Sequence, residues 1–328
     1  MSTEGGTKAV VAALLANVGI AVLKFIAFAL TGASSMLAEA IHSVADSGNQ
    51  GLLLFGGKRS QREATEQHPF GYGRDRYIYA FIVSIVLFSV GGLFALYEAY
   101  HKWHEVREGH PNELLEGPYW WVAIAVLSGA IVMESFSFRT AIVESNKARG
   151  DAGWVEFVRN AKSPELPVIL LEDLGALIGL VLALIGVGTA LLTGNAMWDV
   201  AGTAAIGLLL VTIAVVLAIE TKSLLVGEGA APAAVRRIRA AIESESAIDR
   251  VIHMKTLHLG PDELLVAAKI GVPGSTSAAD VAAAIDAAER RIRDAEPLAR
   301  VIYLEPDVYR SDYEPDPRPE PPASPAAH

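Results

Sequence analysis

Long apolar stretches recur six times along the first part of this 328-residue chain. Each contains roughly 20 residues, which is enough for a helix to cross a hydrocarbon core of about 30 Å. We therefore expect six transmembrane helices, including the first stretch, which lacks a convincing signal-peptide cleavage site. The expected spans are Lys8 to Leu30, Ser34 to Gly57, Ile78 to Tyr100, Tyr119 to Phe138, Leu166 to Leu192 and Trp198 to Ile219.

After Gly227 the pattern changes to that of a small soluble domain. Helical periodicity predicts two helices, the second with Thr276 or Ser277 as its N-cap, and short apolar runs predict three strands. Their order, αββαβ, gives a sheet with helices on one face, as in ferredoxin-like or metallochaperone-like α+β domains. The expected elements are Ala233 to Glu245 (helix), Arg250 to Leu259 and Leu264 to Val272 (strands), Ser275 to Ala295 (helix) and Ala299 to Leu304 (strand).

These patterns divide the chain into three regions. We predict an all-α six-helix transmembrane bundle over 1–227, a cytosolic αββαβ domain over 228–308 and a disordered proline-rich tail over 309–328. Basic residues collect in the loops after the second and fourth expected spans, which places both chain ends in the cytoplasm. These residues are Lys58, Arg59, Arg62, Arg74 and Arg76 in the first loop and Arg139, Lys147, Arg149, Arg159 and Lys162 in the second.

Composition narrows the kinds of chemistry that are expected. Apolar residues make up 52% of the chain, and the mean hydropathy is +0.36, which is typical of a membrane protein rather than a soluble one. The net charge of -10 provides no basic field for nucleic acid, so we expect no nucleic-acid partner. Cysteine is absent, so any metal site must use nitrogen and oxygen ligands.

The second expected span carries an unusual polar stripe. Glu39, His42, Asp46 and Asn49 are spaced three, four and three residues apart, so they lie on one face of a helix. His42 and Asp46 are one turn apart and offer an imidazole nitrogen and a carboxylate to a divalent ion. The alternative is a hydrogen-bonded His–Asp pair that only joins helices. At the middle of a membrane span we favour the metal-binding interpretation.

The fifth expected span contains the adjacent acids Glu172 and Asp173. Neighbouring positions on a helix diverge by about 100°, so both acids cannot face one point equally well. A divalent ion, or protons in its place, would balance their charge; the alternative is one ligand and one acid bonded to a neighbouring helix. Elsewhere in the spans, Lys24 is expected to snorkel or to pair with an acid, and Glu98 and Glu134 to be interfacial.

With these motifs the chain resembles the cation diffusion facilitator family of divalent-metal/proton antiporters. Its span-two pair, a His or Asp followed four residues later by Asp, corresponds here to His42 and Asp46. A family loop motif before span three corresponds to His68-Pro69-Phe70-Gly71-Tyr72-Gly73-Arg74. The resemblance extends from about Lys8 to Asp307 and includes the αββαβ order of the soluble domain.

Departures from the family pattern point to one branch of it. The family commonly has a metal ligand four residues before the span-five Asp, but that place holds Ile169 here, while Glu172 precedes Asp173. This is similar to the branch containing the mitochondrial zinc exporter of animals, which also has a Leu-Glu-Asp segment. The metal ligands that the resemblance implies are His42, Asp46, Asp173 and Glu172, with Asn49 or water as alternatives to Glu172.

Two accessory metal sites of the family are expected to be lost. Tyr72 stands where many members have a second loop histidine. In the soluble domain, His253 and Glu305 stand near places where some members bind a pair of zinc ions, but the other histidines are absent. The resemblance then implies that this domain serves mainly as a dimerisation surface.

The function implied is proton-coupled efflux of a divalent metal from the cytoplasm by a homodimer with alternating access. The protein would not be an enzyme and would have no cofactor beside the transported ion, with Zn²⁺ favoured and Mn²⁺, Fe²⁺ or Co²⁺ admitted. Its partners would be metal, protons and membrane lipid, and its expected location is the bacterial inner membrane. Two alternatives from other classes are a metal-responsive membrane sensor and an intramembrane metallohydrolase.

Overall fold

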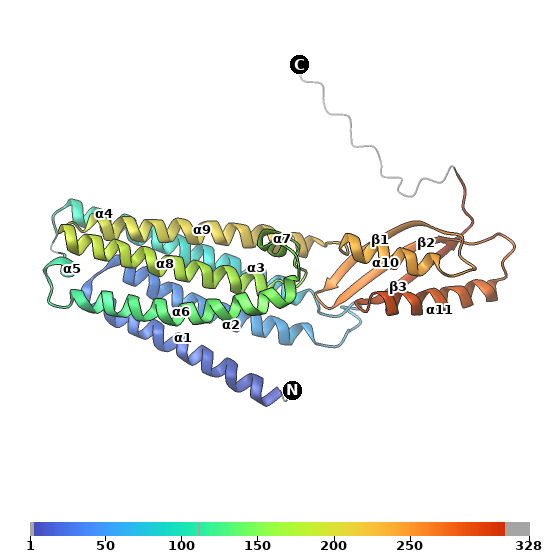
Figure 1. Ribbon diagram of the computed structural model, residues 1–328, viewed down its shortest axis with the longest axis horizontal. Helices are drawn as coiled ribbons and strands as arrows, with labels where there is room; N and C mark the ends of the chain where they lie inside the picture. Colours follow the sequence, from blue (N-terminus) through green and yellow to red (C-terminus); the bar gives the residue numbers. More distant parts are fainter. Residues whose placement is uncertain (1–2, 111, 312–328) are drawn as a thin grey trace, which may run out of the picture. The chain divides into compact units, whose positions relative to one another are not determined.

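The computed structural model describes residues 3–110 and 112–311, and it divides into two compact units after Val226. The first unit consists of helices (Figure 1). They are α1 (Thr3–Thr31), α2 (Ser34–Ser60), α3 (Asp75–Val86), the π-helix η1 (Leu87–Leu93), α4 (Phe94–Arg107), α5 (Glu113–Glu116), α6 (Trp120–Arg149), α7 (Trp154–Asn160), α8 (Glu165–Thr193) and α9 (Met197–Val226). Most of the predicted tail, residues 312–328, lies outside the described residues.

Four helical segments among the described residues are long and apolar enough to cross a membrane. They are Asp75–Arg107, which joins α3, η1 and α4, and the helices α6, α8 and α9. The first two predicted spans correspond to α1, which contributes the shorter apolar helix Asn17–Thr31, and to α2. Helix α2 carries charged residues along its length and packs against α1, α3, η1, α4, α8 and α9.

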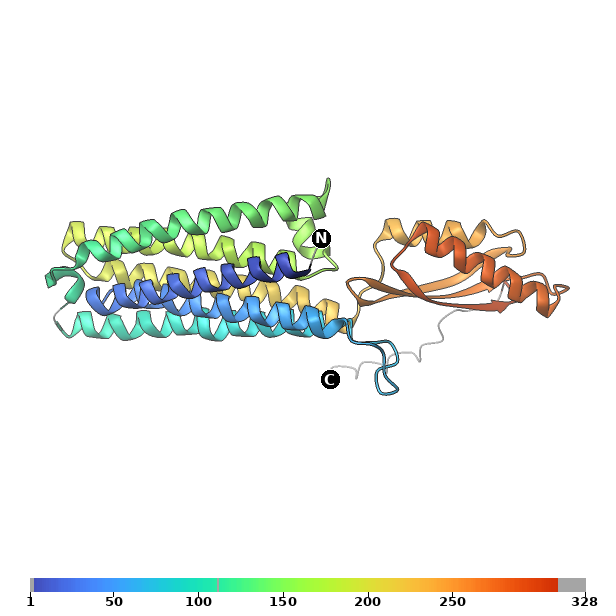
Figure 2. The same cartoon turned by 90° about the horizontal axis from the view of Figure 1, so that it is seen from below.

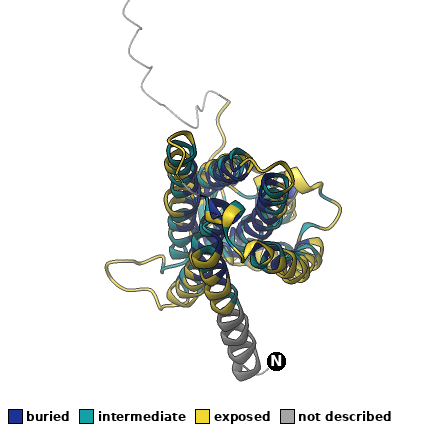
Figure 3. Ribbon diagram, turned by 90° about the vertical axis from the view of Figure 1, so that its left-hand side faces the viewer, coloured by how far each residue is buried: buried dark blue, intermediate teal, exposed yellow. Residues whose placement is uncertain are grey.

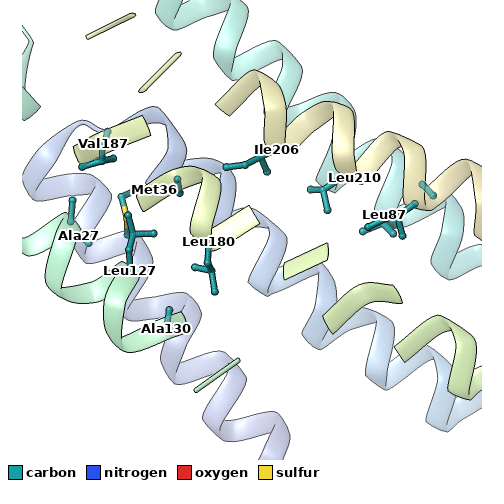
Figure 4. Packing of buried hydrophobic residues seen from close by; sticks show 14 of the residues in the cluster. Ala27, Met36, Leu87, Leu127, Ala130, Leu180, Val187, Ile206 and Leu210 are labelled. Atoms are coloured by element: carbon teal, nitrogen blue, oxygen red, sulfur yellow. The ribbon is translucent and has the colours of Figure 1, made fainter. Parts of the chain in front are cut away.

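A shared apolar core joins the long helices. Buried residues lie toward the middle of the bundle and exposed residues toward its periphery (Figure 3). Figure 4 shows this packing from close by, with side chains from most of the long helices meeting one another. The residues labelled there are Ala27, Met36, Leu87, Leu127, Ala130, Leu180, Val187, Ile206 and Leu210, each at most 7% exposed.

The third span and α9 approach each other closely at two glycines. A Cβ atom added at Gly92 in η1 would lie 2.6 Å from Val211 Cγ2 and 3.0 Å from its main-chain nitrogen. A Cβ at Gly207 in α9 would lie 2.8 Å from Leu96 Cγ. Glycine is therefore required for this approach, as at many helix crossings in membranes. The π-helical turn with Gly92 interrupts α-helical hydrogen bonding in the middle of the span.

The start of α2 is held by an acid from α9. Asp199 Oδ2 accepts hydrogen bonds from the main-chain nitrogen of Ser34 at 2.8 Å and from its hydroxyl at 3.0 Å. Asp199 Oδ1 accepts from the main-chain nitrogen of Ser35 at 3.3 Å and also from the Ser35 hydroxyl. Since the first N–H groups of a helix lack partners within the helix, Asp199 acts as a cap supplied by another helix.

The second unit contains α10 (Pro232–Glu243), β1 (Arg250–Gly260), β2 (Glu263–Gly271), α11 (Ala278–Ala295) and β3 (Ala299–Asp307), which is the predicted αββαβ order. The sheet order is β1-β2-β3, with β1 and β2 antiparallel and β2 and β3 parallel. Figure 2 shows both helices on one face of the sheet. Ser277 caps α11 by accepting a hydrogen bond from the main-chain nitrogen of Asp280 at 3.2 Å, as expected.

Alternation along the strands separates an apolar face from a polar one. The apolar face packs against α10 and α11, and strand and helix residues form one buried cluster that includes Leu264, Val266 and Ile270 of β2, Ile238 and Ile242 of α10, and Ala288 and Ile292 of α11. Across the three strands, His253 of β1 is opposite Lys269 of β2, and Lys269 is opposite Glu305 of β3. The Lys269 ammonium lies 2.8 Å from Glu305 Oε1 and 3.2 Å from Asp307 Oδ2. Lys269 therefore lies between His253 and Glu305, the two residues that stand near zinc-binding places of the family.

Candidate metal site

The polar stripe of α2 is buried inside the helical unit. Glu39, His42 and Asn49 are at most 1% exposed, and the side chain of Asp46 is 20% exposed. The spacing of three, four and three residues brings them onto one face of the helix, as the sequence predicted. Burial of so many polar groups in one membrane helix requires partners or ligands.

His42 and Asp46 lie one turn apart, with His42 Nε2 3.5 Å from Asp46 Oδ2. Among residues 3–110 and 112–311, neither ring nitrogen of His42 has a hydrogen-bond partner, and neither has Asp46 Oδ1. A Cβ at Gly91 of η1 would stand 3.8 Å from His42 Nδ1, so the imidazole packs against the π-helical turn. The pair thus presents unused nitrogen and oxygen donors, which is what a divalent metal ion needs.

Glu172 on α8 is tied to the α2 stripe. Its Oε1 atom accepts a hydrogen bond from Asn49 Nδ2 at 2.6 Å, so a carboxylate from α8 reaches the face that carries His42 and Asp46. Asn49 Oδ1 has no hydrogen-bond partner in the described part of the chain. An amide oxygen and a carboxylate are therefore held side by side between α2 and α8.

Asp173 points to a different helix. Its Oδ2 atom accepts a hydrogen bond from Ser137 of α6 at 2.9 Å. The two acids thus diverge around α8 as the helix angle demands, with Glu172 toward α2 and Asp173 toward α6. The sequence could not determine which acid faces α2, because a single helix does not define the positions of its neighbours.

The four predicted ligands lie in the same part of the bundle, but their side chains do not converge on one point. No group of three or more His, Asp or Glu residues in the described ranges lies close enough to hold a metal ion as it stands. The carboxylates of Glu172, Asp173 and Glu134 nevertheless lie near enough to Asp46 for their charges to interact. Carboxyl groups from α2, α6 and α8 are therefore gathered around the end of the stripe, where they can take up a cation or protons.

Sequence reasoning missed three contributors to this region. Glu134 of α6, interpreted as interfacial, is half-buried, and its charge interacts with that of Asp173. Ser137 carries no signal that distinguishes it from other hydroxyls in a membrane helix. Asp199 was absent from the predicted polar set; it lies in the first turn of α9 and caps the start of α2.

Comparison with known proteins adds a family relationship to this geometry. The family pattern described as the cation efflux transmembrane domain matches residues 10–226, which is more than half of the chain and includes every predicted ligand.

Curated relatives extend the match into the second unit. The mitochondrial proton-coupled zinc antiporter SLC30A9 of Xenopus laevis is 31% identical over 280 residues, covering 84% of this chain and 48% of that protein. SLC30A9 of Homo sapiens is 30% identical over 277 residues, covering 83% of this chain and 47% of that protein. Metal tolerance protein C4 of Arabidopsis thaliana is 26% identical over 277 residues, covering 84% and 59%. The chain thus spans about half the length of the zinc antiporters that it matches.

Proposed function

We propose, because this chain belongs to the cation efflux family, that it moves a divalent metal ion out of the cytoplasm in exchange for protons. The protein is a membrane protein, with apolar helices in the matched region. The observation that carries the proposal is the His42 imidazole beside Asp46 in a buried stripe, with neither ring nitrogen holding a hydrogen bond to any residue that the structure describes. Imidazole and carboxylate together are typical ligands of zinc and other divalent transition metals.

The proposed ligands are His42, Asp46, Asp173 and Glu172. A metal ion would draw Glu172 from Asn49 and Asp173 from Ser137, replacing each hydrogen bond by a bond to the ion. Protons can neutralise the same carboxylates when the metal leaves, and this competition couples the two fluxes. Alternating access would bring the ligands of α2 and α8 together in one state and separate them in another.

The membrane arrangement is also a proposal. We infer six spans, with α1 and α2 joining the four apolar segments, because α2 packs against α1 and against three of those segments: α3-η1-α4, α8 and α9. The basic loops support a cytoplasmic location for both chain ends. A bacterial inner membrane and a homodimer complete the proposal, with the second unit, whose helix and strand order is that of a ferredoxin-like or metallochaperone-like domain, as the dimerisation surface.

Zinc is the favoured ion, since the relatives named above include proton-coupled zinc antiporters. Mn²⁺, Fe²⁺ and Co²⁺ remain candidates because carboxylates outnumber imidazoles in the ligand set. The sensor alternative is less well supported, because Lys269 is paired with Glu305 where a metal-responsive soluble site would be needed. The hydrolase alternative receives no specific support from the site.

The test is transport by purified protein in sealed vesicles with a pH gradient. Each of Zn²⁺, Mn²⁺, Fe²⁺ and Co²⁺ is offered separately, and ion movement and internal pH are followed together. The proposal requires saturable metal flux that is accelerated by an opposing proton gradient. Metal flux equal to that of protein-free vesicles for all four ions would overturn it.

A further inference from the structure

A lysine and a glutamate form an ion pair buried between α1 and α2. Lys24 Nζ lies 3.0 Å from Glu39 Oε2, and their side chains are 4% and 0% exposed. Charged groups inside a membrane span are costly and persist where a partner or a task requires them. From the sequence we expected Lys24 to snorkel or to pair with an acid. In the structure it pairs with Glu39.

The surroundings of the Lys24 ammonium are made of oxygen atoms. Besides Glu39 Oε2, it donates to the Ser43 hydroxyl at 2.7 Å and approaches the Glu39 main-chain oxygen at 3.5 Å. Carboxylate, hydroxyl and carbonyl oxygens are also the ligands that hard metal cations take up. The oxygen atoms around the ammonium group could therefore also bind a small cation.

One further oxygen at this place has no partner. Glu39 Oε1 is buried and has no hydrogen-bond partner within residues 3–110 and 112–311. It lies against α8 at Gly179, where an added Cβ would stand only 2.7 Å away. The second carboxylate oxygen of Glu39 is therefore available to bind a cation between α2 and α8.

This oxygen cluster is next to the candidate metal site. Glu39 precedes His42 by three residues, Ser43 follows it directly, and the charge of Lys24 acts on both His42 and Asp46. A divalent ion at His42 would therefore have a second cation position within about one helical turn. In the structure the Lys24 ammonium, a single positive charge, occupies this position.

We propose that the Lys24 ammonium is a built-in cation that fills this second position, formed by Glu39 and Ser43, and so limits the adjacent site to one divalent ion. The inference rests on the proposed function only for the identity of the neighbouring site. It deepens that function by assigning Lys24 and Glu39 a role in setting how many ions the protein binds. The pair is not assigned a part in metal coordination in the native protein.

The test removes the ammonium and counts ions. Full-length wild type, Lys24→Met and Lys24→Met/Glu39→Gln are purified, and binding is measured by titration calorimetry with Mn²⁺, which favours oxygen ligands, and with Zn²⁺. Lys24→Met should bind one more Mn²⁺ per chain than wild type. The double variant, in which the carboxylate is also gone, should return to the wild-type number.

The same variants also serve as controls for correct folding. The double variant leaves no charge at this position and should keep the wild-type melting temperature. Lys24→Met leaves Glu39 without its partner and should melt lower, and Mn²⁺ should restore its melting temperature while having no such effect on the double variant. If Lys24→Met gains no ion and no restoration, or if the gain persists in the double variant, the proposal is wrong.

Failure of this inference is distinguishable from failure of the proposed function. If wild type neither binds nor moves metal, the transport proposal fails, and an extra ion in Lys24→Met would still support the second position. If wild type transports metal and Lys24→Met shows the same ion count, only the role of Lys24 and Glu39 is contradicted.

Discussion

Asn49 on α2 donates a hydrogen bond of 2.6 Å to Glu172 on α8, while the adjacent Asp173 accepts one of 2.9 Å from Ser137 on α6. The two neighbouring acids are therefore engaged by different helices. Glu172 is held by the shorter bond, to the α2 stripe itself. This contrast leads to the first prediction.

Glu172→Gln should weaken metal affinity about tenfold and leave some proton-coupled transport, since one charged ligand of a tightly held pair is lost. Asp173→Asn should abolish coupled transport, since Asp173 has only a hydroxyl partner to give up. Metal affinity by calorimetry and flux in vesicles, both normalised to folded protein, decide between them. Equal loss in both variants would make Glu172 a full ligand, and wild-type behaviour of Glu172→Gln would reduce it to a link between α2 and α8.

The cap that Asp199 supplies to α2 predicts a purely structural defect. Asp199→Ala leaves the N–H groups of Ser34 and Ser35 without their acceptor, and loss of an N-cap typically costs about 0.5–2 kcal/mol. We expect a lower melting temperature with unchanged metal affinity per folded molecule. Asp151→Ala, at an exposed acid after α6, is the matched control and should melt like wild type. A normal melting temperature for Asp199→Ala would show that water replaces the cap.

The second unit should fold without metal. Residues 228–308 have their own buried cluster, and Lys269 already pairs with Glu305 on the sheet face where the resemblance pointed to zinc. Expressed alone, this segment should melt cooperatively after treatment with a chelator, and added Zn²⁺ should leave its melting temperature unchanged. A large rise with stoichiometric zinc would mean that His253 and Glu305 form a metal site despite Lys269.

The same segment offers a test in pH. The hydrogen bond from Lys269 lowers the pKa of Asp307, whose ordinary value is near 3.9. Because the pKa is lowered by folding, Asp307 stabilises the folded state above about pH 4, and the effect disappears as pH falls through the lowered pKa. Asp307→Asn should therefore melt below wild type at pH 7 and together with it near pH 2. A difference that is independent of pH would contradict the role of this carboxylate charge.

Local pattern predicted those features that depend on one helix or one strand. The period of Glu39, His42, Asp46 and Asn49 placed them on one face, and the structure buries that face. Alternation and turn residues likewise predicted the αββαβ order, and residue type predicted Thr276 or Ser277 as the cap, of which the structure shows Ser277.

Contacts between distant residues could not be derived in that way. Asp199 and Ser34 are 165 positions apart, and nothing in either local sequence indicates that α9 supplies a cap to α2. The acid that pairs with Lys24 could not be predicted for the same reason, because the expected spans contain several acidic residues and the sequence does not show which one α1 contacts. The π-helical turn beside His42 packs at Gly92 against α9, and periodicity does not encode this contact.

The central claim is that the α2 stripe binds the transported metal, and Asp46→Ala tests it most directly. Asp46 supplies a carboxylate beside the unpartnered His42 ring, and its Oδ1 atom has no hydrogen-bond partner in the part of the chain that the structure describes. Its removal should thus cost little stability. The measurement is Zn²⁺ flux in vesicles under a pH gradient, with folded protein matched to wild type. The account predicts flux no greater than that of protein-free vesicles; wild-type flux from well-folded Asp46→Ala would contradict it.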